Sequence, residues 1–114
     1  MFELCPSLTT APELPATTLA LGCYQSMFSG CSKLTKAPEL PATTLADYCY
    51  EYMFSGCSKL NYIKALFTTT PSSTYTDNWV SDVSSTGTFV KSSAANWNVT
   101  GAYGIPTGWT VETA

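Results

Sequence analysis

The amino-acid sequence predicts an α/β repeat protein: a short solenoid with parallel strands on one face, helices on the other, and degenerate C-terminal capping repeats. The main observation is internal repetition, since residues 5–30 and 31–56 are identical at 19 of 26 aligned positions. Each copy also joins a proline-containing extended stretch to a stretch with helical apolar spacing. One such unit cannot bury its own apolar side chains, so successive units are expected to stack.

The extended part of the repeat is clearest in the second copy, where residues 34–41 read LTKAPELP. Prolines exclude a helix at these positions, and the residues before them favour extended geometry. We expect the equivalent segments of successive copies to align as parallel strands about 4.8 Å apart.

A helix is predicted for the rest of the second copy, over residues 43–56. Thr43 or Thr44 can cap its start, and Gly56 stands where a left-handed residue ends a helix. The apolar residues between them recur on one helical face: Leu45, Ala46, Cys49, Tyr50, Met53 and Phe54. The period of 26 falls within the range of about 20–29 residues typical of leucine-rich repeats.

The C-terminal third, after Phe67, is rich in Ser and Thr but keeps structural signals. Thr76 or Asp77 is expected to cap a short helix, and strands are expected at 88–92 and 109–113. These two degenerate repeats would add strands to the sheet and cover its last edge, which would otherwise invite pairing with another chain.

All three tryptophans lie in this third of the chain: Trp79, Trp97 and Trp109. One interpretation is that all three fill the core of the cap. The other is that one of them is exposed and stacks on a sugar ring.

The chain is predicted to be one continuous domain, with repeats of period 26 in residues 1–67 and the cap in residues 68–114. The copies start at Cys5, Cys31 and Cys57. Because Met1 stands at the position that Met27 and Met53 occupy in their copies, the chain is expected to begin within a repeat. It is then a piece of a longer array or a domain without an N-terminal cap.

The motifs MFSGCSKL and APELPATTLA, each present twice, and the C-terminal run GIPTGWTV carry a resemblance to BspA-like leucine-rich-repeat proteins. The resemblance implies a solenoid at the surface of a bacterial cell, often linked to adhesion, but no common ligand. The period here is longer than is usual for that family. Extracellular placement rests on the resemblance alone, because the start of the chain lacks the charged and apolar regions of a signal peptide.

Composition excludes several classes of function. The chain has no His, which removes the commonest general base and metal ligand. Its five basic residues form no run, so we expect no nucleic-acid binding. No apolar stretch approaches the roughly 20 residues of a membrane span, so we expect no membrane insertion. No catalytic, cofactor or metal site is predicted.

The five cysteines follow the repeat rather than a metal or catalytic motif. Cys23 and Cys49 would lie about 8–10 Å apart on packed helices, too far for a disulfide, whose Cα atoms need about 4.4–6.8 Å. Cys5, Cys31 and Cys57 lie nearer the strands, where either buried thiols or disulfides fit, and buried thiols are preferred.

Two surfaces are candidates for binding. The strand face carries Thr10, Thr35, Lys36, Asn61, Tyr62 and Lys64, and solenoids bind through such ladders. The outward side of the predicted helix carries Tyr48 and Tyr52 beside two acidic residues. These residues either recognise a ligand or stand at outward positions where the fold does not constrain the sequence. Glu13 and Glu39 are expected to form a solvated row rather than a catalytic pair.

The sequence therefore supports a non-catalytic binding or adhesion module that faces a protein or glycan outside the cell. The alternative is a structural spacer or terminal cap of a larger bacterial surface protein, with no ligand of its own. An enzyme such as a glycosidase is disfavoured.

Overall fold

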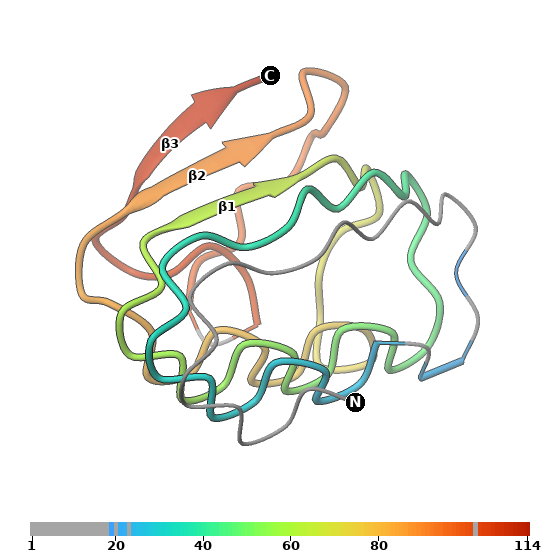
Figure 1. Ribbon diagram of the computed structural model, residues 1–114. Coiled ribbons are helices and arrows are strands. Elements are labelled where there is room, and N and C mark those ends of the chain that lie inside the picture. Colours follow the sequence, from blue (N-terminus) through green and yellow to red (C-terminus); the bar gives the residue numbers. More distant parts are fainter. Residues whose placement is uncertain (1–18, 20, 23, 102) are drawn as a thin grey trace.

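The computed structural model describes residues 19, 21, 22, 24–101 and 103–114, and contains two layers (Figure 1). One layer is a parallel sheet of strands β1 (Tyr62–Ala65), β2 (Thr88–Lys91) and β3 (Thr110–Thr113). The other layer consists of three runs of turns, at residues 21–30 apart from residue 23, which is not described, at 47–56, and at 73–82 with a bend at Thr76. We call them the first, second and third turn runs. The connection from β1 to β2 passes through the third turn run.

The strands lie in chain order, β1-β2-β3, with a simple register. Tyr62 faces Thr88, one 26-residue period later, and Thr88 faces Thr110, only 22 residues later. Strands were predicted at 88–92 and 109–113, and β2 and β3 confirm both positions.

The proline-containing segment at 35–40 lies beside β1 and extends the sheet by one irregular member. Asn61 N–H donates to the Thr35 carbonyl at 3.0 Å, and Leu40 N–H donates to the Lys64 carbonyl at 3.0 Å. Ala37 N–H donates to the Tyr62 carbonyl at 3.0 Å, and the next donor to β1 is Leu40, three residues later instead of two, so the ladder is irregular. The equivalent stretch in β1 has no proline and forms a regular strand.

The fold-class prediction of an α/β solenoid with helices on one face is wrong, because the described residues contain no helix. The predicted helix over 43–56 is replaced by the second turn run, and the short helix near Thr76 by the third. The prediction that Thr76 or Asp77 caps a helix also fails, since no described helix begins there. The Thr76 hydroxyl instead donates to the Tyr103 carbonyl at 2.6 Å, with the Ser72 carbonyl 3.1 Å away. No described helix is long and apolar enough to cross a membrane.

The first and second turn runs are not helices because every second backbone N–H bonds to a carbonyl of the next copy. In the first run, Met27 N–H donates to the Tyr24 carbonyl, three residues back, at 3.2 Å. Its neighbour Phe28 instead donates to the Met53 carbonyl of the next copy, at 2.9 Å. An α-helix would use every N–H internally, whereas here every second one joins neighbouring copies.

The backbone conformation of the runs is also periodic, with a left-handed residue at every fourth position. In the second run these residues are Tyr48 (φ 58°), Tyr52 (φ 54°) and Gly56 (φ 80°). The left-handed conformation expected at Gly56 is therefore present, although no helix precedes it. Tyr48 and Tyr52 adopt a conformation that L residues with a β-carbon disfavour.

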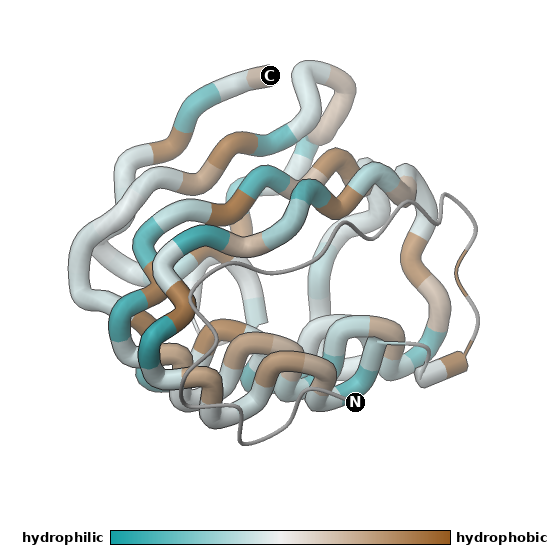
Figure 2. The backbone as a smooth tube through the Cα atoms, in the orientation of Figure 1, coloured by the Kyte–Doolittle hydropathy of each residue, from teal (hydrophilic) through white to brown (hydrophobic). Residues whose placement is uncertain are grey.

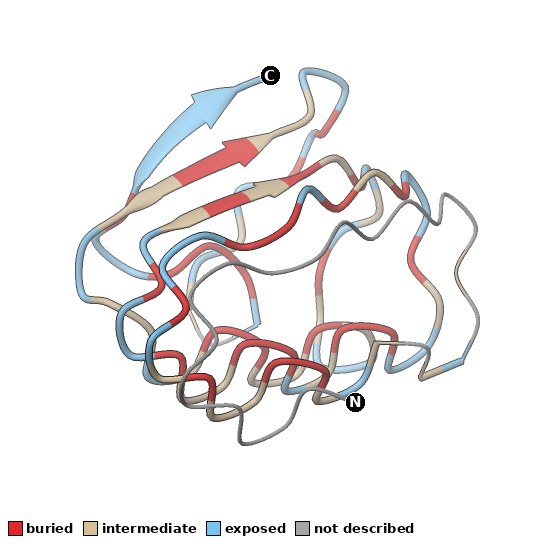
Figure 3. Ribbon diagram, viewed as in Figure 1, coloured by how far each residue is buried: buried red, intermediate tan, exposed pale blue. Residues whose placement is uncertain are grey.

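The core lies between the two layers and is formed by equivalent residues of successive copies. Figure 2 shows hydrophobic residues recurring along adjacent turn runs, and Figure 3 shows the corresponding burial. Phe28 and Phe54 stack with ring centres 5.7 Å apart, and Tyr50 stacks on Trp79 at 5.8 Å. Of the six residues predicted to face the core, Ala46 is half-buried and the other five are buried. The five are Leu45, Cys49, Tyr50, Met53 and Phe54.

The tryptophans fill the core of the C-terminal part, so none is an exposed sugar platform. Trp79 is 0%, Trp97 4% and Trp109 7% exposed. Each indole N–H donates to a backbone carbonyl, as in the 3.0 Å bond from Trp79 to Gly104.

The last edge of the described sheet is not covered, contrary to prediction. All four residues of β3 are exposed (Figure 3). Val111 continues the buried row of Ile63 and Phe89 but is 43% exposed. The C-terminal residues therefore add a strand without closing the edge.

Candidate binding surface

The strongest candidate site is the outer face of the sheet, the side turned away from the core. In β1, Ile63 and Ala65 are fully buried, so the alternating residues Tyr62 and Lys64 project outward. The register then assigns the outward positions of the other strands. This outer sheet face comprises Lys36, Glu39, Tyr62, Lys64, Thr88, Thr110 and Glu112, which are exposed or half-buried, and Val90, which is only 8% exposed.

Side chains from neighbouring segments pair at one end of this face. The Lys36 ammonium lies 5.1 Å from the centre of the Tyr62 ring, within cation–π range. Lys64 Nζ lies 3.1 Å from a Glu39 carboxylate oxygen. Both members of that ion pair are substantially exposed, so it contributes little to stability. Glu39, which was expected to be solvated, is therefore exposed but also ion-paired with Lys64.

The other end of the face is uncharged until Glu112. Thr88 and Thr110 continue the row that begins at Tyr62, and Val90 separates Lys64 from Glu112 in the adjacent row. Because Glu39 offsets the charge of Lys64, the face has a basic end at Lys36 and an acidic end at Glu112.

The predicted site residues divide between two surfaces. Thr35, Lys36, Asn61, Tyr62 and Lys64 lie together on or beside the sheet, and Thr35 and Asn61 are exposed where the strand begins.

Tyr48 and Tyr52 lie in the second turn run, in the layer opposite the sheet (Figure 1), and are 44% and 40% exposed. The sequence correctly indicated that they face outward, but they are not continuous with the strand face. Thr10, Cys5, Cys23 and Glu13 lie outside the described residues.

Sequence reasoning missed four residues of the outer sheet face: Thr88, Val90, Thr110 and Glu112. Thr88 and Val90 stand one period of 26 after Tyr62 and Lys64, so the repeat itself would have indicated them. Thr110 and Glu112 follow after only 22 residues, and the period gives no signal for them.

The described cysteines contribute to the core rather than to a reactive site. Cys31, Cys49 and Cys57 are fully buried. Burial, followed by electrostatic repulsion from Cys31, raises the pKa of Cys57 to about 12 from 9.0. Its thiol donates to the Phe28 carbonyl at 3.1 Å. Because the thiolate is the nucleophilic form, Cys57 is inert near neutral pH.

The described residues also include no group of three cysteine or carboxylate side chains close enough to hold a metal ion. Comparison of the chain with models of protein families, with curated proteins and with solved structures found no match. The resemblance to BspA-like proteins therefore stays an expectation that rests on the sequence motifs.

Proposed function

We propose that the chain is a non-catalytic binding module that uses the outer sheet face to recognise a protein outside the cell. The observation that carries the proposal is the row of side chains across three strands and the adjoining segment, which serves no purpose in the core. The strands hold this row on hydrogen-bonded backbone, so little backbone conformational entropy is lost on binding. Placement outside the cell is supported by the family resemblance alone.

A protein partner fits this face better than a glycan. Sugar rings stack on open aromatic faces, but the Lys36 ammonium lies over the ring of Tyr62. The face also combines a basic end with an acidic end, a pattern that orients a partner of complementary charge.

The experiment is a binding screen of the full chain against extracellular proteins, mucins and purified glycans, repeated with Lys36→Ala/Tyr62→Ala. Loss of binding in this double variant, with an unchanged thermal unfolding curve, supports the proposal. The matched control is Lys33→Ala/Tyr103→Ala, which removes the same residue types from exposed positions outside both candidate surfaces. Equal binding by the two double variants and the parent would show that the outer sheet face is not the site.

The second candidate is a structural spacer, and the uncovered edge of β3 favours it. An exposed strand edge is a template for pairing with further polypeptide. A chain that binds nothing in the screen, while a longer protein containing it does bind, would favour the spacer.

A further inference from the structure

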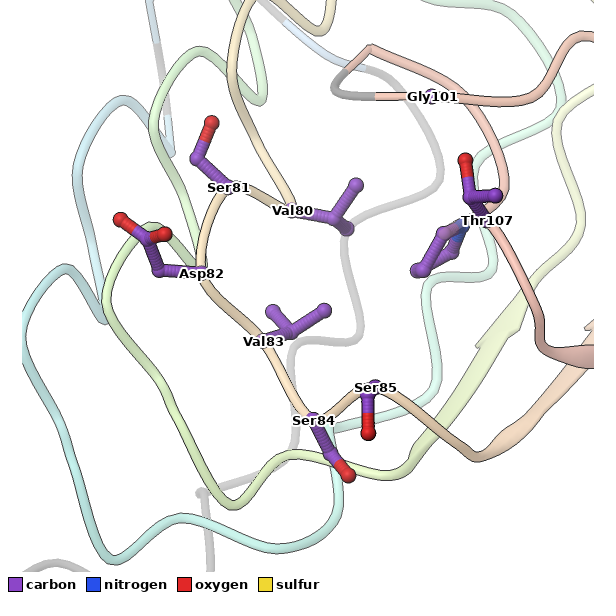
Figure 4. A pocket seen from close by; sticks show the side chains of 9 residues that line it. Val80, Ser81, Asp82, Val83, Ser84, Ser85, Gly101 and Thr107 are labelled. Carbon is purple, nitrogen blue, oxygen red and sulfur yellow. The ribbon is translucent and has the colours of Figure 1, made fainter.

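A hollow of about 380 Å³ lies beside the third turn run, away from the outer sheet face. Residues 80–85 line one side of it and Gly101 and Thr107 the other (Figure 4), and Pro106 is also among the lining residues. Val80 and Val83 point toward Thr107 across the hollow, whereas the Asp82 carboxylate points the other way. The volume is within the range of ligand sites.

Five backbone N–H groups of the lining residues have no acceptor within the described part of the chain: those of Val80, Asp82, Val83, Ser85 and Thr107. Two of them, Val80 and Asp82, stand at positions that make bonds between copies elsewhere in the chain. Their equivalents one copy earlier are both paired with the next turn run. Phe54 N–H donates to the Trp79 carbonyl at 2.8 Å, and Gly56 N–H donates to the Ser81 carbonyl at 2.9 Å. The third run has the same alternation, so its two donors are directed to where a fourth run would lie.

The chain fills only part of that space. Between β2 and β3 it is four residues short of a full period, since Thr88 faces Thr110 rather than position 114. The shortened connection places the Tyr103 and Gly104 carbonyls on the side chains of Thr76 and Trp79. It leaves the remaining part, next to Val80 and Asp82, as the hollow.

We infer that the hollow binds a polypeptide segment carrying the repeat's own Met-Phe-Ser-Gly turn, through its main-chain carbonyls. The same contact already occurs between the first and second copies. There, the carbonyls of Met53 and Ser55 accept from Phe28 and Gly30 at 2.9 and 2.8 Å. A bound segment would offer its Met carbonyl to Val80 and its Ser carbonyl to Asp82.

The surroundings suit such an uncharged ligand. The apolar side chains of Val80, Val83 and Pro106 can contact the Met or Phe side chain of the segment. The hydroxyls of Ser84 and Thr107 line the same space and can pair with further backbone groups. The lining contains no cationic side chain, so a peptide carbonyl fits it better than a carboxylate.

The test uses the full chain and a peptide with the sequence of residues 53–60, Ser in place of Cys57, an acetylated N-terminus and an amidated C-terminus. Amide NMR spectra are recorded during titration to millimolar peptide. We expect the Val80 and Asp82 resonances to shift and their hydrogen exchange to slow toward that of Phe54 and Gly56. A scrambled peptide of the same composition is expected to have no effect.

Thr107→Trp fills the hollow and is expected to weaken binding at least about tenfold. Thr70→Trp is the control, since Thr70 is exposed and does not line the hollow. If Thr107→Trp disturbs the spectrum as a whole, Ser85→Trp replaces it. Unshifted Val80 and Asp82 resonances would overturn the inference. Equal effects of the scrambled peptide, or undiminished binding by the variant that fills the hollow, would also overturn it.

Discussion

Replacing Phe54 with Ala is the most direct test of the packing between copies. Phe54 is fully buried and lies between the stacked ring of Phe28, 5.7 Å away, and the tilted indole of Trp79, 6.0 Å away. Truncating a buried Phe costs about 3–5 kcal/mol. The loss of two aromatic pairs, each contributing about 0.5–1.5 kcal/mol, moves the expected value toward the upper end.

The corresponding change in melting temperature follows from the size of the chain. An unfolding entropy of about 2.1 cal/mol/K per residue gives about 0.24 kcal/mol/K for 114 residues. Phe54→Ala should therefore lower the melting temperature by about 12–20 °C, measured by circular dichroism or calorimetry.

The matched control is Leu21→Ala, since Leu21 is a large apolar residue of the first turn run that is 72% exposed. Its effect should stay within about 0.5 kcal/mol, as for other surface substitutions. A Phe54→Ala protein that melts with the parent would refute the stacking of rings between copies.

Three further predictions concern single positions. The raised pKa of Cys57 implies stability that is complete below about pH 9 and declines up to about pH 12, because the unfolded thiol ionises first. Urea unfolding should show this decline, and Cys57→Ala should reduce it. Tyr52→Asn should stabilise the chain by about 0.5–1 kcal/mol, since Asn tolerates the left-handed conformation at φ 54°; a lower urea midpoint would contradict this. Gly87→Ala should cost about 1–3 kcal/mol by overpacking, because its Cβ would lie 2.6 Å from the Asn61 carbonyl oxygen and 2.7 Å from the Trp109 ring; an unchanged midpoint would show that the site relaxes.

The sequence was most informative where burial and strand position were concerned. The apolar positions of the second copy indicated which side chains form the core, and Tyr50, Met53 and Phe54 are fully buried. Strand positions followed from β-favouring residues between turn signals, as at β2 and β3. The grouping of Lys36, Tyr62 and Lys64 on one face followed from their positions in the repeat, which the register of the sheet preserves.

The remainder of the candidate site depended on a feature that the repeat does not encode. The connection between β2 and β3 is four residues shorter than a period, and this places Thr110 beside Thr88 and Glu112 beside Val90. The length of that connection also leaves the hollow beside the third turn run. Neither consequence follows from periodicity, because each depends on how far the chain departs from it.

The helix prediction failed because two backbone arrangements share nearly the same apolar spacing. A helix repeats every 3.6 residues, whereas the turn runs place a left-handed residue every fourth position, as at Tyr48, Tyr52 and Gly56. Over ten residues the two periods bury almost the same side chains. The two arrangements differ in the acceptors of alternate N–H groups. In the first and second turn runs these groups bond to carbonyls of the next copy, as Phe54 N–H does to the Trp79 carbonyl at 2.8 Å. Only stacked copies supply those acceptors, so the local pattern of a single repeat favoured a helix that the repeated chain does not form.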